Sequence, residues 1–452
     1  MRVDIQNMDP KPPEPCPTLT SAQIAGAANA QLPYMVENLS TFVAAASLSG
    51  AEQPAAAFME DALRALGLTS ERIHLNSDAL KALPLYSPPC CADGGRYNLL
   101  AVHEPQQEGG RSVLFNGHLD VVPTGPEKLW RRPPFAPYVE DGWLFGRGAG
   151  DMKAGIVCTL AAFRALRALG VQPAGRVGFN AVLEEENTGN GTLASVSALR
   201  NAMNADRLSA FDVAIIPEPL GERMISAQVG VLWLFVELTG RPAHAAYMSS
   251  GASAIEAGIA VIDDLKKLEA EWNAPQNRHP AYREHAHPIN FNIGQIKGGE
   301  WNSSVPCSCT LGVRIGFYPD MSVETAKARV SACVQATLAR LGSGLALNIR
   351  YEGFQAPGCE FDLTGPALQH LAAAHRTVHG AEIEHEATTA TTDARHFRLM
   401  LDTPVTCYGP EARNIHGIDE SVSLASMLQV ATTLAQFLHD WCGVEPIAQD
   451  RE

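Results

Sequence analysis

The stretch VLFNGHLDVVPTGPEKLWRRPPFAPYVEDGWLFGRGAGDMK, residues 113–153, decides the fold and the chemistry expected of this chain. It begins with a short apolar run that predicts a β-strand, and this strand leads into His118 and Asp120. A long loop rich in Pro and Gly then leads to Asp151, which opens a helix predicted for residues 152–169. One imidazole and two carboxylates thus stand at the ends of two regular elements, and such groups suit a divalent metal ion.

Each of these residues also has a plain structural explanation. An isolated Asp in front of a helix is usually its N-cap, and Gly170 would close this helix. An isolated His after a strand is more often a hydrogen-bonded residue than a ligand. The spacing of His118 and Asp120 allows a ligand and the carboxylate that orients it. Only further ligands from other parts of the chain would make a metal site persuasive.

The composition indicates a globular protein of two domains. At 452 residues the chain is too long for one ordinary domain, and 46% of its residues are hydrophobic against 18% charged. The net charge of −15 argues against binding nucleic acid or an anionic membrane surface, which would need a basic patch. No apolar run approaches the roughly 18 residues of a membrane span. We therefore expect neither nucleic acid nor a membrane as a partner.

The N-terminus and the cysteines favour a cytoplasmic location. The first 17 residues contain five prolines and are expected to be disordered or loosely attached. They lack the apolar core of a signal peptide. The ten cysteines show no paired CxxC pattern of a zinc knuckle, and we interpret them as reduced thiols.

Short, nearly all-apolar strands alternate with helices in residues 1–230 and again in 353–452. This pattern predicts an α/β domain with a mixed, mainly parallel sheet covered on both faces. Residues 231–352 show instead the β-α-β-β-α-β order of a ferredoxin-like α+β sandwich, inserted between the two parts. The predicted strands are 99–102, 113–115, 176–183, 213–216, 231–238, 289–296, 307–315, 346–351 and 404–408. The predicted helices are 21–46, 53–66, 152–169, 193–203, 253–272, 323–341, 366–378 and 422–441.

Further polar residues follow three other strands of the predicted α/β domain. They are Glu184-Glu185-Glu186 after strand 176–183, Glu218 after strand 213–216, and His416 in the loop after strand 404–408. Ligands of open α/β sheets collect at the carboxyl ends of the strands. Three adjacent glutamates are usually a solvated run, but beside an apolar strand and a Gly-rich turn their charges are costly without a counter-cation. Each site alone is more often structural, yet five candidate ligands on one predicted edge favour a metal site.

The chain therefore carries a set of short motifs: His118-x-Asp120, Gly146-Arg-Gly-x-x-Asp151-Met-Lys153, Glu185-Glu186, Glu218 and His416. Together they resemble the signature of the M20 metallopeptidase family, which includes acetylornithine deacetylase, succinyl-diaminopimelate desuccinylase and carboxypeptidase G. The resemblance covers about residues 35–442. The segments EEENTGNGT, GGEWNSSVP and YGPEARNIHGIDE look most like the acetylornithine-deacetylase-like deacylases. The resemblance to the family implies a zinc-exopeptidase-like catalytic domain with an inserted lid and dimerisation domain.

The resemblance also implies two divalent metal ions per subunit, usually zinc, with cobalt or manganese as alternatives. Asp151 and a water molecule would bridge the two ions. His118 and Glu218 would complete one metal site, and Glu186 and His416 would complete the other.

Two neighbours of these ligands are expected to act in catalysis. Asp120 would fix the tautomer of His118. Glu185 would be the general base that takes a proton from the water and passes it to the leaving amine. Glu184 is expected to be structural or solvated.

Four residues outside this group also match positions with a role in the family. His244 would reach the active site of the other subunit of a homodimer and stabilise the oxyanion, and Asn302 would bind the substrate or the oxyanion. Arg314 and Arg395 would hold a substrate carboxylate, for which the guanidinium fork is suited. The plain alternatives are a loop histidine and structural ion pairs. Relatives often carry Asp-x-Arg where this chain has Gly312-Val-Arg314.

The predicted function is that of a metal-dependent amidohydrolase that releases the acyl group of an N-acyl amino acid or a similar small amide. One alternative is a dipeptidase or carboxypeptidase of the same fold. Another is a different C–N hydrolase, such as a deformylase or an aromatic aminohydrolase. A non-catalytic binding relative is a further alternative, and the intact ligand set with Glu185 counts against it.

Overall fold

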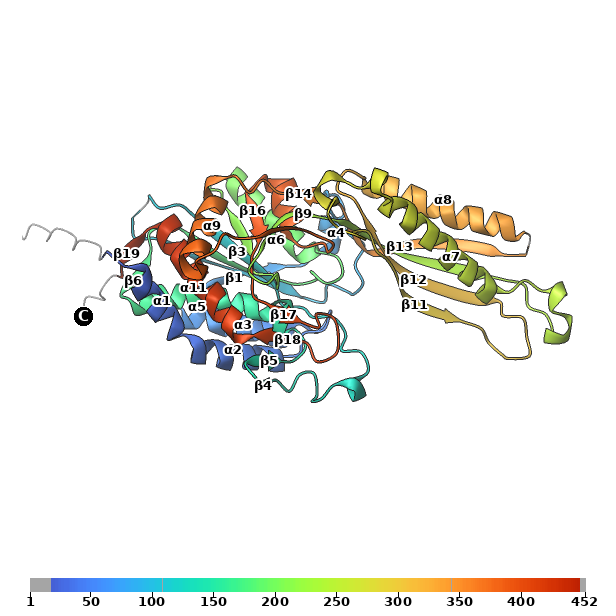
Figure 1. Ribbon diagram of the computed structural model, residues 1–452, viewed down its shortest axis with the longest axis horizontal. Coiled ribbons are helices and arrows are strands. Elements are labelled where there is room, and N and C mark those ends of the chain that lie inside the picture. The colour runs from blue at the N-terminus through green and yellow to red at the C-terminus, as the bar shows by residue number, and fades with distance from the viewer. Residues whose placement is uncertain (1–17, 108, 343, 448–452) are drawn as a thin grey trace, which may run out of the picture.

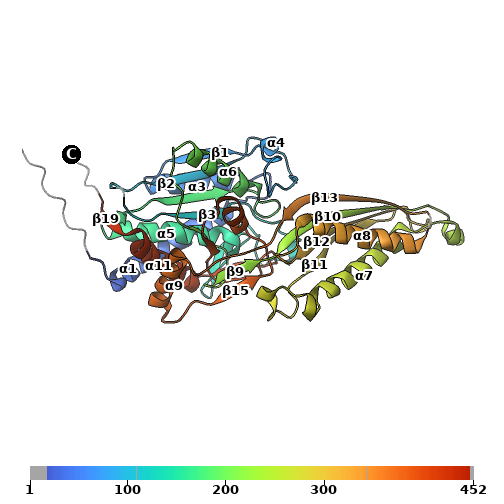
Figure 2. The same cartoon turned by 90° about the horizontal axis from the view of Figure 1, so that it is seen from above.

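The computed structural model describes residues 18–447 except 108 and 343, so the expectation for the first 17 residues lies outside the described part. The chain forms a large α/β body and a narrower body that projects from one side of it (Figures 1 and 2). No helix in the described ranges is long and apolar enough to cross a membrane.

The large body is built on a six-stranded sheet in the order β1-β2-β7-β3-β8-β16. Its strands are β1 (Ser70–His74), β2 (Tyr97–His103), β7 (Val177–Val182), β3 (Val113–His118), β8 (Ala214–Ile216) and β16 (Val405–Cys407). The last four are parallel to one another, while β1 and β2 are antiparallel to their neighbours. The α/β fold class with a mixed, mainly parallel sheet is therefore confirmed.

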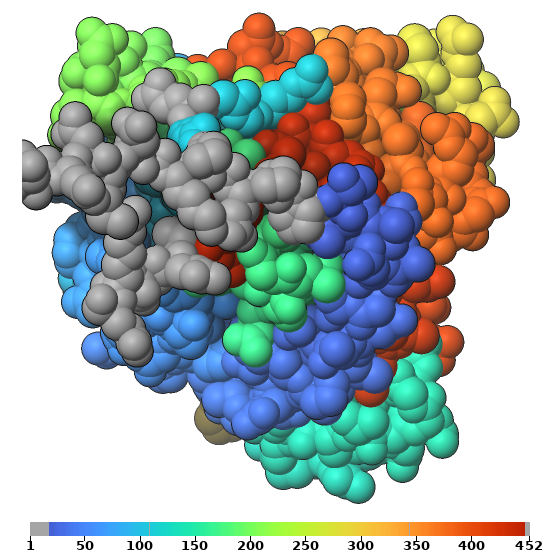
Figure 3. Space-filling view, turned by 90° about the vertical axis from the view of Figure 1, so that its left-hand side faces the viewer, coloured from blue at the N-terminus to red at the C-terminus, as the bar shows by residue number. Residues whose placement is uncertain are grey.

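Helices cover both faces of this sheet (Figure 2). The helices of the large body are α1 (Ser21–Asn29), α2 (Leu32–Ala44), α3 (Gln53–Ala65), α4 (Ser77–Leu80), α5 (Ala154–Ala168), α6 (Asn190–Asn204), α9 (Pro366–His379), α10 (Ala394–His396) and α11 (Leu424–Phe437). The helix α5 is buried over most of its surface because it lies between the sheet and the helices α1, α2 and α11. Figure 3 shows the end of this body opposite the narrow one, where the N-terminal helices lie beside C-terminal segments.

Three small sheets complete the large body. The first contains β14 (Cys359–Glu360), β9 (Met224–Gln228) and β15 (His385–Thr388). The second contains β17 (Ala412–Arg413), β18 (Ser421–Ser423), β5 (Trp143–Phe145) and β4 (Tyr138–Glu140). The third pairs β19 (Val444–Pro446) with β6 (Val171–Pro173). The antiparallel pairing of β18 with β5 matters most, because it brings the loop before β18 next to the segment that follows β5.

Two predicted helices differ from the structure in an informative way. The single helix predicted for residues 21–46 is two helices, because Pro33 starts a new one in its first turn. The helix predicted from residue 152 begins only at Ala154. Asp151 has non-helical backbone angles (φ −109°, ψ 100°) and does not cap α5. The alternative that Asp151 is only an N-cap is therefore wrong.

The narrow body has the predicted β-α-β-β-α-β order. Its elements are β10 (Gly230–Thr239), α7 (Ala254–Asn273), β11 (Phe291–Gly298), β12 (Ser308–Phe317), α8 (Val323–Leu341) and β13 (Ala346–Ala356). The sheet is antiparallel in the order β11-β12-β10-β13, and α7 and α8 pack on one face of it. Leu232, Leu234, Val236 and Leu238 point to these helices and belong to a core separate from that of the large body. Domain boundaries at residues 231 and 352 stay a proposal, which this separate core supports.

Candidate metal centre

Four adjacent parallel strands of the large sheet end at one edge, and candidate ligands follow each of them. His118 is the last residue of β3, Glu186 follows β7, and Glu218 comes two residues after β8. His416 lies in the loop between β16 and β18. Because these strands are parallel neighbours in the order β7-β3-β8-β16, their carboxyl ends bring the side chains together.

Asp151 joins these residues into two overlapping sets of ligands. His118, Asp151 and Glu218 form one set, and Asp151, Glu186 and His416 form the other. Within each set, one ligand atom per residue lies within 4.8 Å of the others. Oδ1 of Asp151 is 3.0 Å from Nε2 of His118, and Oδ2 is 3.3 Å from Nε2 of His416. The two oxygens of one carboxylate thus serve different sets. We call these five residues the ligand cluster.

The electrostatics of the ligand cluster call for added positive charge. Burial disfavours a charged His118, but its hydrogen bond to Asp151 and the nearby Glu218 raise its pKa well above the usual value. Burial likewise opposes charge on His416, yet Glu186 and Asp151 raise the pKa of His416 to about 11. Burial and the charge of Asp151 raise the pKa of Glu218 well above its usual range. Three carboxylates thus outnumber two imidazoles in a site that is largely buried except at His416, whose side chain is 52% exposed, and this excess of negative charge is costly without cations.

The residues present fit the two divalent ions that the resemblance to the M20 family implies. Oε1 of Glu186 is buried and has no hydrogen-bond partner among the described residues, so it is free to be a ligand. Two imidazoles and three carboxylates without sulfur are the donor set of zinc, manganese or cobalt sites.

Asp120 holds its neighbours in a different way from the one predicted. Nδ1 of His118 donates to the backbone carbonyl of Asp120 at 2.9 Å, whereas the carboxylate is 3.8 Å away. The two carboxylate oxygens accept hydrogen bonds from the backbone N–H groups of Glu185 and Glu186, each at 3.2 Å. The expected tautomer of His118, with Nε2 free for a metal, is therefore set by the carbonyl. The carboxylate fixes the backbone of the two glutamates.

The three adjacent glutamates have three different surroundings. Glu186 belongs to the ligand cluster, and Glu185 is buried beside it, which raises the pKa of Glu185 well above its usual value. Glu184 has a left-handed backbone (φ 64°), and its carboxylate accepts from Arg96 at 2.5 Å and Thr188 at 2.7 Å. Since Glu184 is fully buried, it is structural rather than solvated.

Arg96 links Glu184 to Glu52 in a buried ion-pair network, and removing this cation should destabilise the fold. Its guanidinium donates to both carboxylates, which are about 1% exposed. Arg96→Met would leave two buried carboxylates without a partner, so unfolding in urea should show a loss of about 3–5 kcal/mol. Arg72→Met removes an exposed arginine that pairs with Glu60, and it should leave the urea midpoint nearly unchanged. Equal midpoints for the two variants would contradict this prediction.

The two predicted substrate arginines have opposite environments. Arg395 is fully buried and its terminal nitrogens donate to the backbone carbonyls of Thr392 (2.6 Å) and Thr188 (3.3 Å), while its Nε has no hydrogen-bond partner among the described residues. Arg314 lies on the outer face of the narrow sheet, and its one hydrogen bond within the described part of the chain is a long contact of 3.5 Å to the carbonyl of Thr389. No carboxylate of the described residues forms an ion pair with Arg314, although burial lowers the pKa of its guanidinium.

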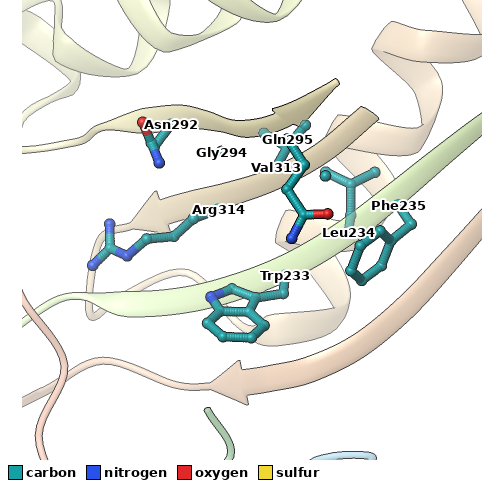
Figure 4. A pocket seen from close by; sticks show the side chains of 9 residues that line it. Trp233, Leu234, Phe235, Asn292, Gly294, Gln295, Val313 and Arg314 are labelled. Atoms are coloured by element: carbon teal, nitrogen blue, oxygen red, sulfur yellow. The ribbon is translucent and has the colours of Figure 1, made fainter. Parts of the chain in front are cut away.

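Arg314 lines a hollow of about 220 Å³ on this face (Figure 4). Trp233 and Asn292 flank it on the neighbouring strands, and Gln295 also lines the hollow. A side chain at Gly312 would meet Gln295 at 3.2 Å, so glycine keeps the hollow open. The hollow thus places the Arg314 guanidinium, which has no ion-pair partner among the described residues, beside the side-chain amides of Asn292 and Gln295 and the ring of Trp233.

His244 and Asn302 lie far from the ligand cluster. The strand β10 starts beside the large body and runs away from it (Figure 2). Its ten residues span about 30 Å. His244 follows its far end and forms a β-bridge with Ser304, next to Asn302. Both predicted residues are exposed, as are Tyr247 and Trp301 beside them. The chain's own fold therefore does not bring His244 to its own ligand cluster.

Sequence reasoning missed one residue of the site, Glu420. It is buried against the segment that carries Asp151. The available signal was a carboxylate four residues after His416 and directly before the short strand β18.

Residues 114–440, well over half of the chain, match Peptidase family M20/M25/M40. The chain belongs to this family and is a hydrolase that acts on amide bonds.

Individual relatives are distant but cover most of the chain. The chain is 26% identical to the N-formyl-4-amino-5-aminomethyl-2-methylpyrimidine deformylase of Bacillus subtilis (strain 168), over 73% of this chain and 79% of that protein. It is 29% identical to the succinyl-diaminopimelate desuccinylase of Dechloromonas aromatica (strain RCB), over 72% and 82%. The structure of the dipeptidase Dug1p from Saccharomyces cerevisiae is similar with a TM-score of 0.76 and 15% identity, covering 94% and 98%. This last similarity concerns the fold.

Proposed function

We propose that this protein is a dizinc amidohydrolase that removes the acyl group of an N-acyl amino acid or a similar small amide. The observation that carries the proposal is the carboxylate of Asp151, which is shared by two sets of ligands. The buried carboxylate of Glu185 lies beside these sets and belongs to neither. A non-catalytic relative would have no need of this arrangement.

The protein's own residues then have separate tasks. Two bound divalent ions would lower the pKa of an attacking water and polarise the scissile carbonyl. Glu185 accepts the proton of that water and passes it to the leaving amine. Asp120 holds the backbone of Glu185 and Glu186, so that the base and the adjacent ligand keep a fixed relation to each other. Burial of Glu185 excludes bulk water from this proton transfer.

The hollow around Arg314 supports the proposed substrate class. Its guanidinium lacks a carboxylate partner in the described residues, and we propose that it holds the carboxylate of the substrate. The names of two relatives, a deformylase and a desuccinylase, describe removal of an acyl group from nitrogen. The name of the structural neighbour instead favours a dipeptidase as the second candidate.

A substrate panel tests this function. Zinc- or cobalt-loaded enzyme is incubated with N-formyl, N-acetyl and N-succinyl amino acids and with dipeptides, and release of amine is measured. Cleavage of N-acyl amino acids in preference to dipeptides is the expected result. Preferential cleavage of dipeptides would favour the second candidate, and no cleavage in either group would count against both.

Metal content is a direct prediction of this proposal. Protein kept away from chelators and loaded with zinc should contain about two divalent ions per chain by elemental analysis. Chelation should abolish activity, and zinc, cobalt or manganese should restore it. Full activity in protein shown to hold no metal would overturn the proposed chemistry.

We further propose a homodimer formed through the narrow body. The exposed position of His244 and Asn302, far from their own ligand cluster, supports a role for them in the site of a second subunit. His244 would then stabilise the oxyanion of the partner's reaction. The side chain of His244 already accepts a hydrogen bond from the backbone N–H of Ala246 at 3.0 Å, which orients its ring. A cytoplasmic location stays a prediction from the sequence.

A further inference from the structure

The carboxylate of Glu420 is surrounded by donors from the segment that carries Asp151. Its Oε1 accepts hydrogen bonds from the backbone N–H groups of Gly150 (2.9 Å) and Asp151 (3.0 Å). Its Oε2 accepts from the N–H of Gly148 (3.1 Å) and from the guanidinium of Arg147 (2.5 Å). Both charged side chains are about 1% exposed. Four donors therefore satisfy this carboxylate without help from solvent.

Arg147 extends the contact to two other loops of the site. Its second terminal nitrogen donates to the carbonyls of Gly417 (2.9 Å) and Pro123 (3.3 Å). Gly417 directly follows His416, and Pro123 lies shortly after Asp120 in the chain. One buried ion pair thus joins the loops that follow β3, β5 and β16.

The backbone at Asp151 needs such an external partner. Its angles are non-helical, and the segment Ala149–Lys153 precedes α5 without a side-chain cap. Backbone N–H groups in this position have no helical acceptor, and leaving them unpaired in a buried place is costly. Glu420, 269 residues further along the chain, supplies the acceptor for the N–H of Asp151.

We propose that Glu420 is a positioning residue which, together with Arg147, fixes the backbone at Asp151 and so holds the shared carboxylate between the two sets of ligands. The inference rests on the proposed function, because it assumes that Asp151 binds metal in both sets. The two oxygens of Asp151 approach different histidines at 3.0 and 3.3 Å, so a turn of the backbone would lengthen at least one of these approaches.

The test compares Glu420→Gln with Asp419→Asn in the full-length protein. Glutamine keeps the size of the side chain but replaces one acceptor oxygen by an NH₂ donor, which would face backbone N–H groups or the guanidinium. Asp419 is the adjacent carboxylate; it accepts from the N–H of Arg131 at 2.9 Å and has no hydrogen bond to residues 148–151. Cobalt titration of the metal-free proteins, followed by the visible absorption of bound Co²⁺, measures the affinity and the ligand geometry.

Glu420→Gln should weaken cobalt binding by about 10–100-fold and change the absorption band, whereas Asp419→Asn should match the wild type. With cobalt at saturation, kcat of Glu420→Gln should be lowered while KM stays near the wild-type value. Arg147→Lys keeps the positive charge but loses the two terminal nitrogens that bind Glu420 and the neighbouring loops, so its cobalt affinity should also fall. If Glu420→Gln does not fold, the cobalt affinity of Arg147→Lys tests the proposal in its place.

Unchanged cobalt affinity and spectrum in the folded variants, with only a lower melting temperature of the metal-free protein, would show a merely structural role and overturn the proposal. Failure of the wild type itself to bind cobalt would be a different result. It would overturn the proposed function and the positioning role with it.

Discussion

Replacing Glu185 by glutamine should lower kcat by about 10²–10⁴-fold while both metal ions stay bound. Glutamine has the same size and can still donate and accept hydrogen bonds, but it cannot take a proton from water. Neither set of ligands contains Glu185, and its backbone is held by Asp120 whether or not its side chain is charged. Elemental analysis should therefore give the metal content of the wild type, and KM should change little.

The neighbouring glutamates are matched controls for this variant. Glu186→Gln removes a carboxylate from the set that contains Asp151 and His416. It should weaken one metal site, and excess zinc should restore part of the activity. Glu184→Gln should instead lower stability, because Glu184 is paired with Arg96 in the core. Loss of metal from Glu185→Gln, with both ions kept by Glu186→Gln, would show that the roles of the two residues are exchanged.

The meeting of four of the five candidate ligands could be predicted because a local pattern fixes their place in a parallel sheet. Each of four strands reads as a short apolar run, and the residue types that follow it are those that metals prefer. Neighbouring parallel strands end at the same edge, so no knowledge of side-chain contacts was needed to expect His118, Glu186, Glu218 and His416 in one place.

What the sequence did not reveal depends on contacts between distant parts of the chain. The turn before α5 is non-helical, and Glu420 accepts hydrogen bonds from its N–H groups from 269 residues away; no periodicity encodes such a contact. The burial of Arg395 has a similar origin: its guanidinium packs against the backbone at Gly189, where an added side chain would clash. The residue type alone does not separate this arginine from Arg314, whose guanidinium lacks a partner carboxylate.

Loss of the imidazole in His244→Ala should lower kcat by about 10²–10³-fold, although His244 lies far from its own ligand cluster. The expected reason, if the proposed homodimer forms, is loss of an oxyanion donor that the second subunit would supply. Metal content and melting temperature should equal those of the wild type, because the side chain is exposed and its one hydrogen bond stays within its own turn. His285→Ala is the matched control; it removes a histidine of the same body at the other end of α7 and should be fully active.

Mixing two inactive variants separates action between subunits from action within one. A homodimer of His244→Ala lacks the oxyanion donor in both sites, and a homodimer of Glu185→Gln lacks the base in both. In a mixed dimer, the site with an intact Glu185 belongs to the His244→Ala chain and receives its histidine from the Glu185→Gln chain. One site of that dimer is then complete, so a random mixture, in which half of the dimers are mixed, should recover about a quarter of the wild-type activity.

Subunit exchange must be shown independently, for example by native mass spectrometry of chains that differ in mass. If exchange occurs and activity stays absent, His244 acts within its own chain or has no part in the reaction, and the exposed end of the narrow body needs another explanation.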